Sequence, residues 1–254
     1  MAKKNGTIEE TYSLPSLGKL YGDNFPSEVT IRTMTTFEEK MRLGNQGFWR
    51  TMCNILDAVV TSPENFDTTQ MTTFDFYFLM YKMRTVSYGA NYKVSVTCPH
   101  CRQKMISNVN LDELKVTYLD DKFCEPIEIG PLPRSGDTLQ CKYLRVSDFI
   151  NNEKRAKDIL RDHPDYDGDP LYILNKASQI VAINGERKSP IEIQMYVEKM
   201  PALDSAYLEQ AYQHFAGGKA GMEMSCRDTC SHCGEELLFD LPFNSEFFRP
   251  TFDF

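Results

Sequence analysis

Hydrophobic positions near the start of the chain follow two different periods. Apolar and polar side chains alternate over residues 29–34, which predicts a strand. Thr35 and Glu38 then form the capping-box pattern that begins a helix. Apolar residues recur at helical spacing from Phe48 to Val60, so a second helix is expected there.

Residues 74–84 are apolar almost all round. A helix of this kind belongs in the centre of a core, or between the core and a partner. Its charged residues are Asp75, Lys82 and Arg84, and we expect them on a solvent-exposed edge because charged side chains are rarely buried. A functional ion pair among them is the alternative.

The second half of the chain mixes strand patterns with helical ones. Strand-like runs cover residues 114–118, 127–129 and 139–144. Helical patterns cover residues 147–161, 190–200 and 203–215. Residues 171–183 are apolar and fit either a helix or a strand. The chain is therefore expected to be an α+β protein.

Two C-x-x-C motifs, separated by roughly half the sequence, supply Cys98, Cys101, Cys230 and Cys233. Alternating apolar residues precede the first motif and follow the second, so each pair is expected at the tip of a hairpin. Two such tips brought together place four thiolates in a tetrahedron, the usual structural zinc site. The sequence thus predicts a split zinc ribbon that joins a helical N-terminal part to a mixed helix and strand insertion.

Three details of this site stay open. The cysteines could be free thiols that never meet, or a redox motif, although no helix pattern follows either pair as a thioredoxin-like motif requires. Cys226, four residues before Cys230, could replace one ligand. The histidines inside the motifs could do the same, or donate hydrogen bonds around the metal.

The pattern divides the chain into five parts. They are an extended arm at residues 1–28, a helical core with the first zinc motif at 29–104, an α+β insertion at 105–221, the second zinc motif at 222–241 and an aromatic tail at 242–254. The arm and the tail carry apolar residues that need a covering surface, on this chain or on a neighbour. The candidate partner-binding residues are Leu14, Leu17, Tyr21, Phe243, Phe247, Phe248, Phe252 and Phe254.

Composition and motifs argue against several functions. The net charge of −8 disfavours a protein that mainly neutralises nucleic-acid phosphates. The chain has no apolar run of transmembrane length and no hydrophobic signal core near its start, so no membrane role is expected. It has no nucleotide-binding loop, no nucleophile elbow and only four histidines. We therefore expect no enzyme and no small-molecule substrate.

Several stretches resemble the baseplate hub and assembly protein family of T-even-like contractile-tailed phages. They are residues 14–22, residues 29–35 with the acidic helix start, residues 86–89 leading into the first cysteine motif, residues 183–185, and the Ser189-Pro190 helix followed by residues 200–204. The resemblance spans most of the chain. Apart from the cysteines, none of these stretches carries chemistry.

The resemblance implies a non-enzymatic part of the virion tail baseplate, assembled in the host cytoplasm. Its partners would be other baseplate, tail-tube or tape-measure proteins, and the structural zinc would hold it together. A tail assembly chaperone that leaves before the particle matures is an alternative. A nucleic-acid-binding zinc ribbon and a thiol oxidoreductase are further alternatives from other classes.

Overall fold

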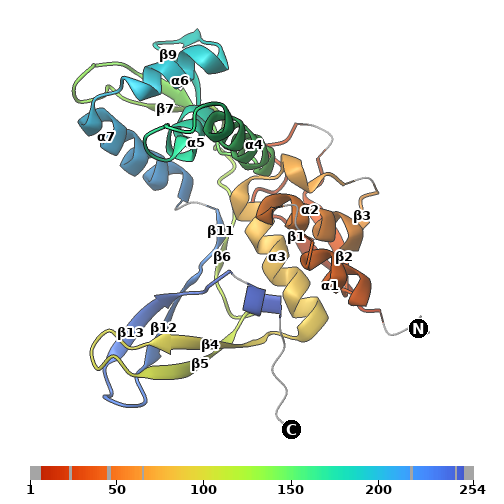
Figure 1. The fold of residues 1–254 in the computed structure, drawn as a ribbon. Coiled ribbons are helices and arrows are strands. Elements are labelled where there is room, and N and C mark those ends of the chain that lie inside the picture. Colours follow the sequence, from red (N-terminus) through yellow and green to blue (C-terminus); the bar gives the residue numbers. More distant parts are fainter. Residues whose placement is uncertain are drawn as a thin grey trace.

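The computed structural model describes residues 7–22, 25–44, 47–64, 66–217, 220–243 and 245–248. Figure 1 shows three regions, with the long helix α3 near the middle. The N-terminal helices and strands lie beside α3, a lobe of helices and short strands lies at one end, and two hairpins project from the other end. A mixed helix and strand fold with four clustered cysteines is thus present, as the sequence predicted.

The N-terminal region combines a small sheet with two helices. The antiparallel sheet contains β1 (Glu9–Ser13), β2 (Glu28–Arg32) and β3 (Val60–Ser62) in that order. The helices are α1 (Thr36–Arg42) and α2 (Phe48–Val59), and a short 3-10 turn, η1, covers Thr68–Gln70. The predicted capping box is present, because Thr35 caps α1 and the Glu38 carboxylate accepts from the Thr35 N–H at 2.7 Å.

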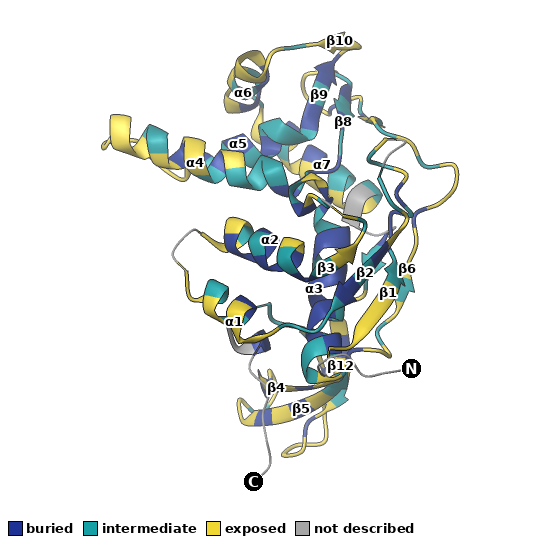
Figure 2. Cartoon of the chain, turned by 90° about the vertical axis from the view of Figure 1, so that its right-hand side faces the viewer, coloured by how far each residue is buried: buried dark blue, intermediate teal, exposed yellow. Residues whose placement is uncertain are grey.

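Helix α3 (Thr73–Tyr88) forms the centre of the larger hydrophobic core. Figure 2 shows it buried along most of its length. The expectation that its charged residues lie on a solvent-exposed edge is wrong for Asp75 and Arg84, which are buried. Both are tolerated because hydrogen bonds replace the lost water: Asp75 accepts two, and Arg84 donates to three backbone carbonyls.

The N-terminal segment is part of the core and not an extended arm. Strand β1 pairs with β2 over five residues, and Leu14 is fully buried, so Leu14 cannot contact a partner. The Tyr21 hydroxyl donates to Asp75 at 2.6 Å, and the Leu20 carbonyl accepts from Arg145 at 2.9 Å. The segment therefore ties α3 to the neighbouring lobe. Leu17 is partly exposed and remains a candidate for partner contact.

The buried Asp75 carboxyl gives the fold a specific pH dependence. Burial raises its pKa from 3.8 to about 6. The folded chain therefore holds this proton at pH values where the unfolded chain releases it, and the stabilisation is lost as pH rises from about 4 through 6. The expected loss is on the order of 3 kcal/mol.

The Asp75→Asn variant should lack this pH dependence, because the amide resembles the neutral acid in shape and cannot ionise. The measurement is the free energy of unfolding of both proteins between pH 4 and pH 7. Relative to Asp75→Asn, the original protein should lose stability across this range. A constant difference between the two would contradict the assignment.

The insertion forms a lobe with its own core. Its four-stranded antiparallel sheet has the order β10 (Glu186–Arg187), β9 (Ile180–Ile183), β8 (Leu139–Cys141) and β7 (Ile127–Ile129). Its helices are α4 (Val146–Asp162), α5 (Pro170–Gln179), α6 (Pro190–Glu198) and α7 (Ala202–Tyr212), and α7 continues into the π-helical turn η2 (Gln213–Gly217). The ambiguous residues 171–183 contain both types of element, since α5 leads directly into β9.

Two short strands connect this lobe to the rest of the chain. Strand β6 (Val116–Thr117) enters it and β11 (Gly221–Met222) leaves it, and the two pair in antiparallel fashion. Gly221 has a φ of +120°, and a Cβ there would lie 3.1 Å from the Phe74 Cβ, so glycine permits β11 to approach α3. The lobe is therefore an insertion whose two ends lie side by side.

The hairpins before and after the insertion pack against each other. The first contains β4 (Asn91–Thr97) and β5 (Lys104–Asn110), and the second contains β12 (Ser225–Thr229) and β13 (Glu236–Asp240). The predicted boundary at residues 104/105 is therefore misplaced, since β5 belongs to the first hairpin. Inward side chains from both hairpins join the larger core: Val94, Val96, Met105, Cys226 and Leu237.

The described part of the aromatic tail folds back onto the core. Phe247 and Phe248, in the 3-10 turn η3 (Ser245–Phe248), are buried, which removes them from the partner-binding candidates. Arg84 donates to the Phe247 carbonyl at 3.0 Å. Phe243 is partly buried against Tyr77 and Phe247. The predicted partner-binding residues Phe252 and Phe254 lie outside the described residues.

Candidate metal centre

The two cysteine motifs form matching turns at the hairpin tips. In the first turn, the Cys98 N–H donates to the Gln103 carbonyl and the Arg102 N–H donates to the Cys98 carbonyl, both at 2.9 Å. In the second, the Cys230 N–H donates to the Glu235 carbonyl and the Gly234 N–H donates to the Cys230 carbonyl, again at 2.9 Å. The same hydrogen bonds therefore shape both turns.

Each turn places one residue in the left-handed region of backbone conformation. This residue directly follows the second cysteine of its pair: Arg102 has a φ of +60° and Gly234 a φ of +76°. Glycine adopts this conformation without strain, whereas an arginine does so at some cost. The repetition of this conformation at equivalent positions indicates that the turn geometry, and not the side chain, is what both motifs require.

The four sulfurs converge at one point, as the sequence predicted. The Sγ atoms of Cys98 and Cys233 lie 3.8 Å apart, and those of Cys101 and Cys230 lie 3.7 Å apart. All four lie within 4.8 Å of one another. Zinc–sulfur bonds of about 2.3 Å place tetrahedral ligands about 3.8 Å apart, so the sulfurs fit a single ion. An iron–sulfur cluster with several irons needs thiolates spaced further apart.

The backbone around the cysteines favours thiolate at one position. The N–H groups of His232 and Cys233 are directed at the Cys230 sulfur, and they lower its pKa from 9.0 to about 6. Cys98 and Cys230 are buried, whereas Cys101 is partly exposed and Cys233 is exposed. The pKa values of Cys101 and Cys233 are raised, in spite of backbone hydrogen bonds that lower them, by burial and by the neighbouring cysteines. Thiolate is the form of cysteine that binds metal, so metal binding would require these two thiols to lose their protons as well. The four sulfurs would form a closed set of ligands around one ion, with no open position.

The alternative ligands lie outside this set. Cys226 is buried on β12 and is not among the clustered sulfurs. Both motif histidines are exposed, and His232 Nε2 lies 3.3 Å from the Lys104 carbonyl, so it can link the second tip to the first hairpin. One bridge escaped the sequence prediction: Ser107 on β5 donates to Asp228 on β12 at 2.6 Å. The sequence pointed to this hydrogen bond only through the alternation of β5, which places Ser107 on the inner face of the strand.

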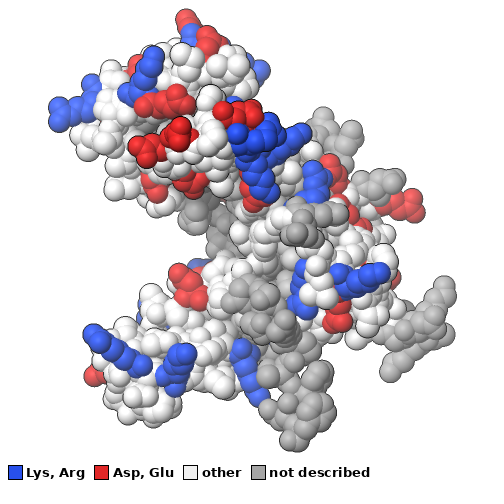
Figure 3. Space-filling view, viewed as in Figure 1, with Lys and Arg blue, Asp and Glu red and all other residues white. Residues whose placement is uncertain are grey.

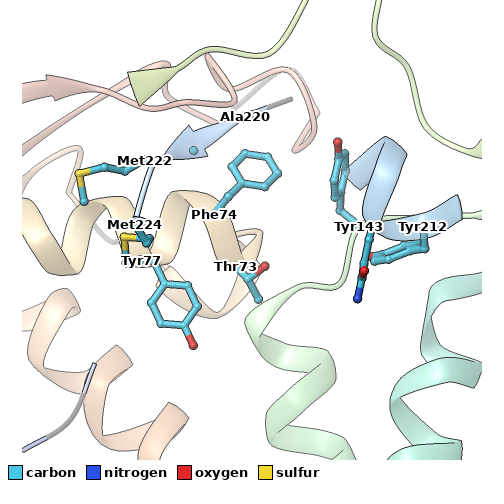
Figure 4. A pocket seen from close by; sticks show the side chains of 10 residues that line it. Thr73, Phe74, Tyr77, Tyr143, Tyr212, Ala220, Met222 and Met224 are labelled. Atoms are coloured by element: carbon cyan, nitrogen blue, oxygen red, sulfur yellow. The ribbon is translucent and has the colours of Figure 1, made fainter. Parts of the chain in front are cut away.

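A separate apolar cavity of about 280 Å³ lies where the insertion meets α3. Phe74 and Tyr77 project from α3, with Met222 and Met224 at one end and the tyrosines of the lobe at the other (Figure 4). Its described lining carries no charged side chain. Burial raises the pKa of Tyr143 to about 12, so this hydroxyl stays protonated at neutral pH. The Tyr143 hydroxyl already donates to the Phe215 carbonyl at 3.1 Å, so the described lining offers mainly apolar surface.

Comparison with protein families assigns the chain. A family model described as T4 bacteriophage base plate protein matches residues 7–249. The chain belongs to the T4 baseplate protein family. No curated protein and no solved structure matches it. None of the described helices combines the length and the apolar character needed to cross a bilayer.

Membership in the T4 baseplate family indicates that this protein acts through contacts with other proteins. Such a protein acts in a phage tail, where contacts with other tail proteins are the expected activity. The family match covers both cysteine motifs and the whole insertion between them. The cysteine cluster is therefore expected to have a structural role in this baseplate protein.

Proposed function

We propose that this protein is a non-enzymatic structural or assembly component of the contractile-tail baseplate. The family match over residues 7–249 carries the proposal. A single zinc ion held by Cys98, Cys101, Cys230 and Cys233 would supply rigidity, and contacts with baseplate, tail-tube or tape-measure proteins would supply function.

The position of the cysteine cluster supports a structural role for a metal bound there. The chain leaves the first hairpin, builds the whole insertion, and returns to the second hairpin through β11. A metal at the tips joins residues 98 and 101 to residues 230 and 233, which closes this long loop. The zinc would act as a structural clasp that holds the insertion at a fixed angle to the N-terminal helices. Leu17, Tyr21 and Phe243 remain candidates for contact with neighbouring subunits, as all three are partly exposed.

Quantitative mass spectrometry of purified phage particles tests the proposal. A structural component should be present in a fixed, small copy number relative to a tail-tube protein. Presence in infected-cell lysate but not in particles would identify an assembly chaperone. Absence from both would overturn the baseplate proposal, and salt-sensitive binding to duplex nucleic acid would then support the zinc-ribbon alternative.

A further inference from the structure

The two hairpins carry opposite charge. The first, residues 91–110, contains Lys93, Arg102 and Lys104 and no acidic residue, which gives a formal charge of +3. The second, residues 225–240, has a formal charge of −3, from one basic and four acidic residues: Arg227, Asp228, Glu235, Glu236 and Asp240. Lys and Arg side chains are visible on the hairpin region in the space-filling view (Figure 3). The pair of hairpins therefore has one basic and one acidic half, although the chain as a whole is acidic.

Each hairpin has one inner and one outer face. Val94 and Met105 of the first hairpin and Leu237 of the second belong to the larger core, and the buried Ser107 of the first donates to Asp228 of the second at 2.6 Å, so the inner faces meet at this contact. Side chains alternate between the two faces of a strand. The residues between the buried ones must then face outward, away from the partner hairpin, and they are exposed.

The outer face of the first hairpin has an aliphatic side chain among basic ones. Ile106 is 65% exposed and lies between Lys104 and Asn108 on β5. Lys93 on β4 is paired with Asn108. An exposed isoleucine thus has a lysine on each side along the hairpin, one on its own strand and one on the neighbouring strand.

The outer face of the second hairpin repeats this arrangement with the opposite charge. Leu238 is 63% exposed and lies between Glu236 and Asp240 on β13. Arg227, directly across from Leu238, lies 3.7 Å from Glu236, and both side chains are largely exposed. An exposed leucine thus has a carboxylate on each side, and the single arginine leaves this face negative.

We propose that the β4–β5 face of one copy packs on the β12–β13 face of a second copy. Residues two apart on a strand are about 6.6–6.8 Å apart, which applies to Lys104 and to both carboxylates. Lys93 is diagonal to Ile106 across the hairpin, at about 7–8 Å, so the spacing on the two faces is similar. With Ile106 on Leu238, Lys104 and Lys93 of one copy lie opposite the carboxylates of the other.

Such a contact joins two different faces of the same chain. It is therefore a head-to-tail contact, which produces a closed ring or an open filament and not a simple twofold dimer. A two-stranded face is smaller than a standard protein interface, so each contact should be weak and sensitive to salt. Ring closure would strengthen it, because the last contact becomes intramolecular. The proposal does not depend on the baseplate role.

Zero-length carbodiimide cross-linking of the purified full-length, metal-loaded protein maps the contact. The reagent joins an amine to a carboxylate in direct contact, and a mixture of isotope-labelled and unlabelled chains identifies cross-links between copies. We expect cross-links from Lys104 or Lys93 to Glu236 or Asp240 of another copy, at low salt. An absence of such cross-links at high protein concentration would overturn the proposal.

Charge reversal supplies the second test, with sedimentation velocity as the measure of association. Lys104→Glu and Glu236→Lys should each weaken self-association by about tenfold or more, since like charges then meet. The double variant Lys104→Glu/Glu236→Lys should recover association, because both faces are reversed together. Lys154→Glu on α4, which changes net charge equally, should have no such effect. Metal content and circular dichroism verify folding. A protein that stays monomeric, or equal effects of Lys104→Glu and Lys154→Glu, would contradict the proposal.

Discussion

Replacing Cys98 by serine should abolish zinc binding and release the two hairpins from each other. The Cys98 sulfur is fully buried and lies 3.8 Å from that of Cys233, so a hydroxyl there removes one of four ligands from a closed site. A two-stranded hairpin is marginally stable by itself in water. The metal should therefore add substantially to the core contacts and the Ser107–Asp228 hydrogen bond that join these two. The zinc content should fall from about one ion per chain to almost none.

Hydrogen exchange localises the effect. Amides in β4, β5, β12 and β13 should exchange at least about tenfold faster in Cys98→Ser, while those of the insertion lobe keep their protection. Cys124→Ser is the matched control, because Cys124 is exposed and lies outside the cysteine cluster. Unchanged exchange in the hairpins of a metal-free Cys98→Ser protein would show that the metal is dispensable for their packing.

Replacing Phe247 by alanine should destabilise the isolated protein by about 3–5 kcal/mol. The ring is fully buried, with its centroid 4.6 Å from that of Tyr81 and 5.0 Å from that of Phe243. Its removal leaves a cavity beside α3. It also removes the cation–π contact with the Arg84 guanidinium, which lies 5.6 Å from the ring centroid. Chemical denaturation of the two purified proteins measures the difference.

The matched control for this prediction is Phe37→Ala, the same truncation at an exposed position in α1. Phe37 is 63% exposed, so its loss should change stability by no more than about 0.5 kcal/mol. If Phe247 served only to contact a partner, Phe247→Ala would behave like this control and impair tail assembly alone. Equal stability of the two variants would therefore contradict the packing of the tail.

Local sequence signals predicted most of the elements because their causes are local. Thr35 and Ser189 begin helices through capping boxes, and both caps are present. The cysteine spacing predicted the hairpin tips because the turn is formed within a few residues. The convergence of the tips followed from chemistry, since four thiolates in two pairs are the usual ligands of one ion.

Predictions that depended on distant contacts were less successful. Charge alone suggested that Asp75 and Arg84 face water, but their partners include Ser16, Tyr21 and Phe247, which lie far away in the sequence. The same contacts explain why Leu14 and Phe247 are core residues and not docking residues. Apolar residues among prolines and glycines indicate that a covering surface exists, but not which chain provides it.

X-ray absorption at the zinc edge of the purified protein tests the metal clasp most directly. The account predicts one zinc per chain with four sulfur ligands at about 2.3 Å and no nitrogen ligand. The four converging cysteine sulfurs and the exposed motif histidines are the basis for that expectation. A nitrogen ligand at about 2.0–2.1 Å, or a protein purified without chelator that contains no stoichiometric zinc, would contradict it.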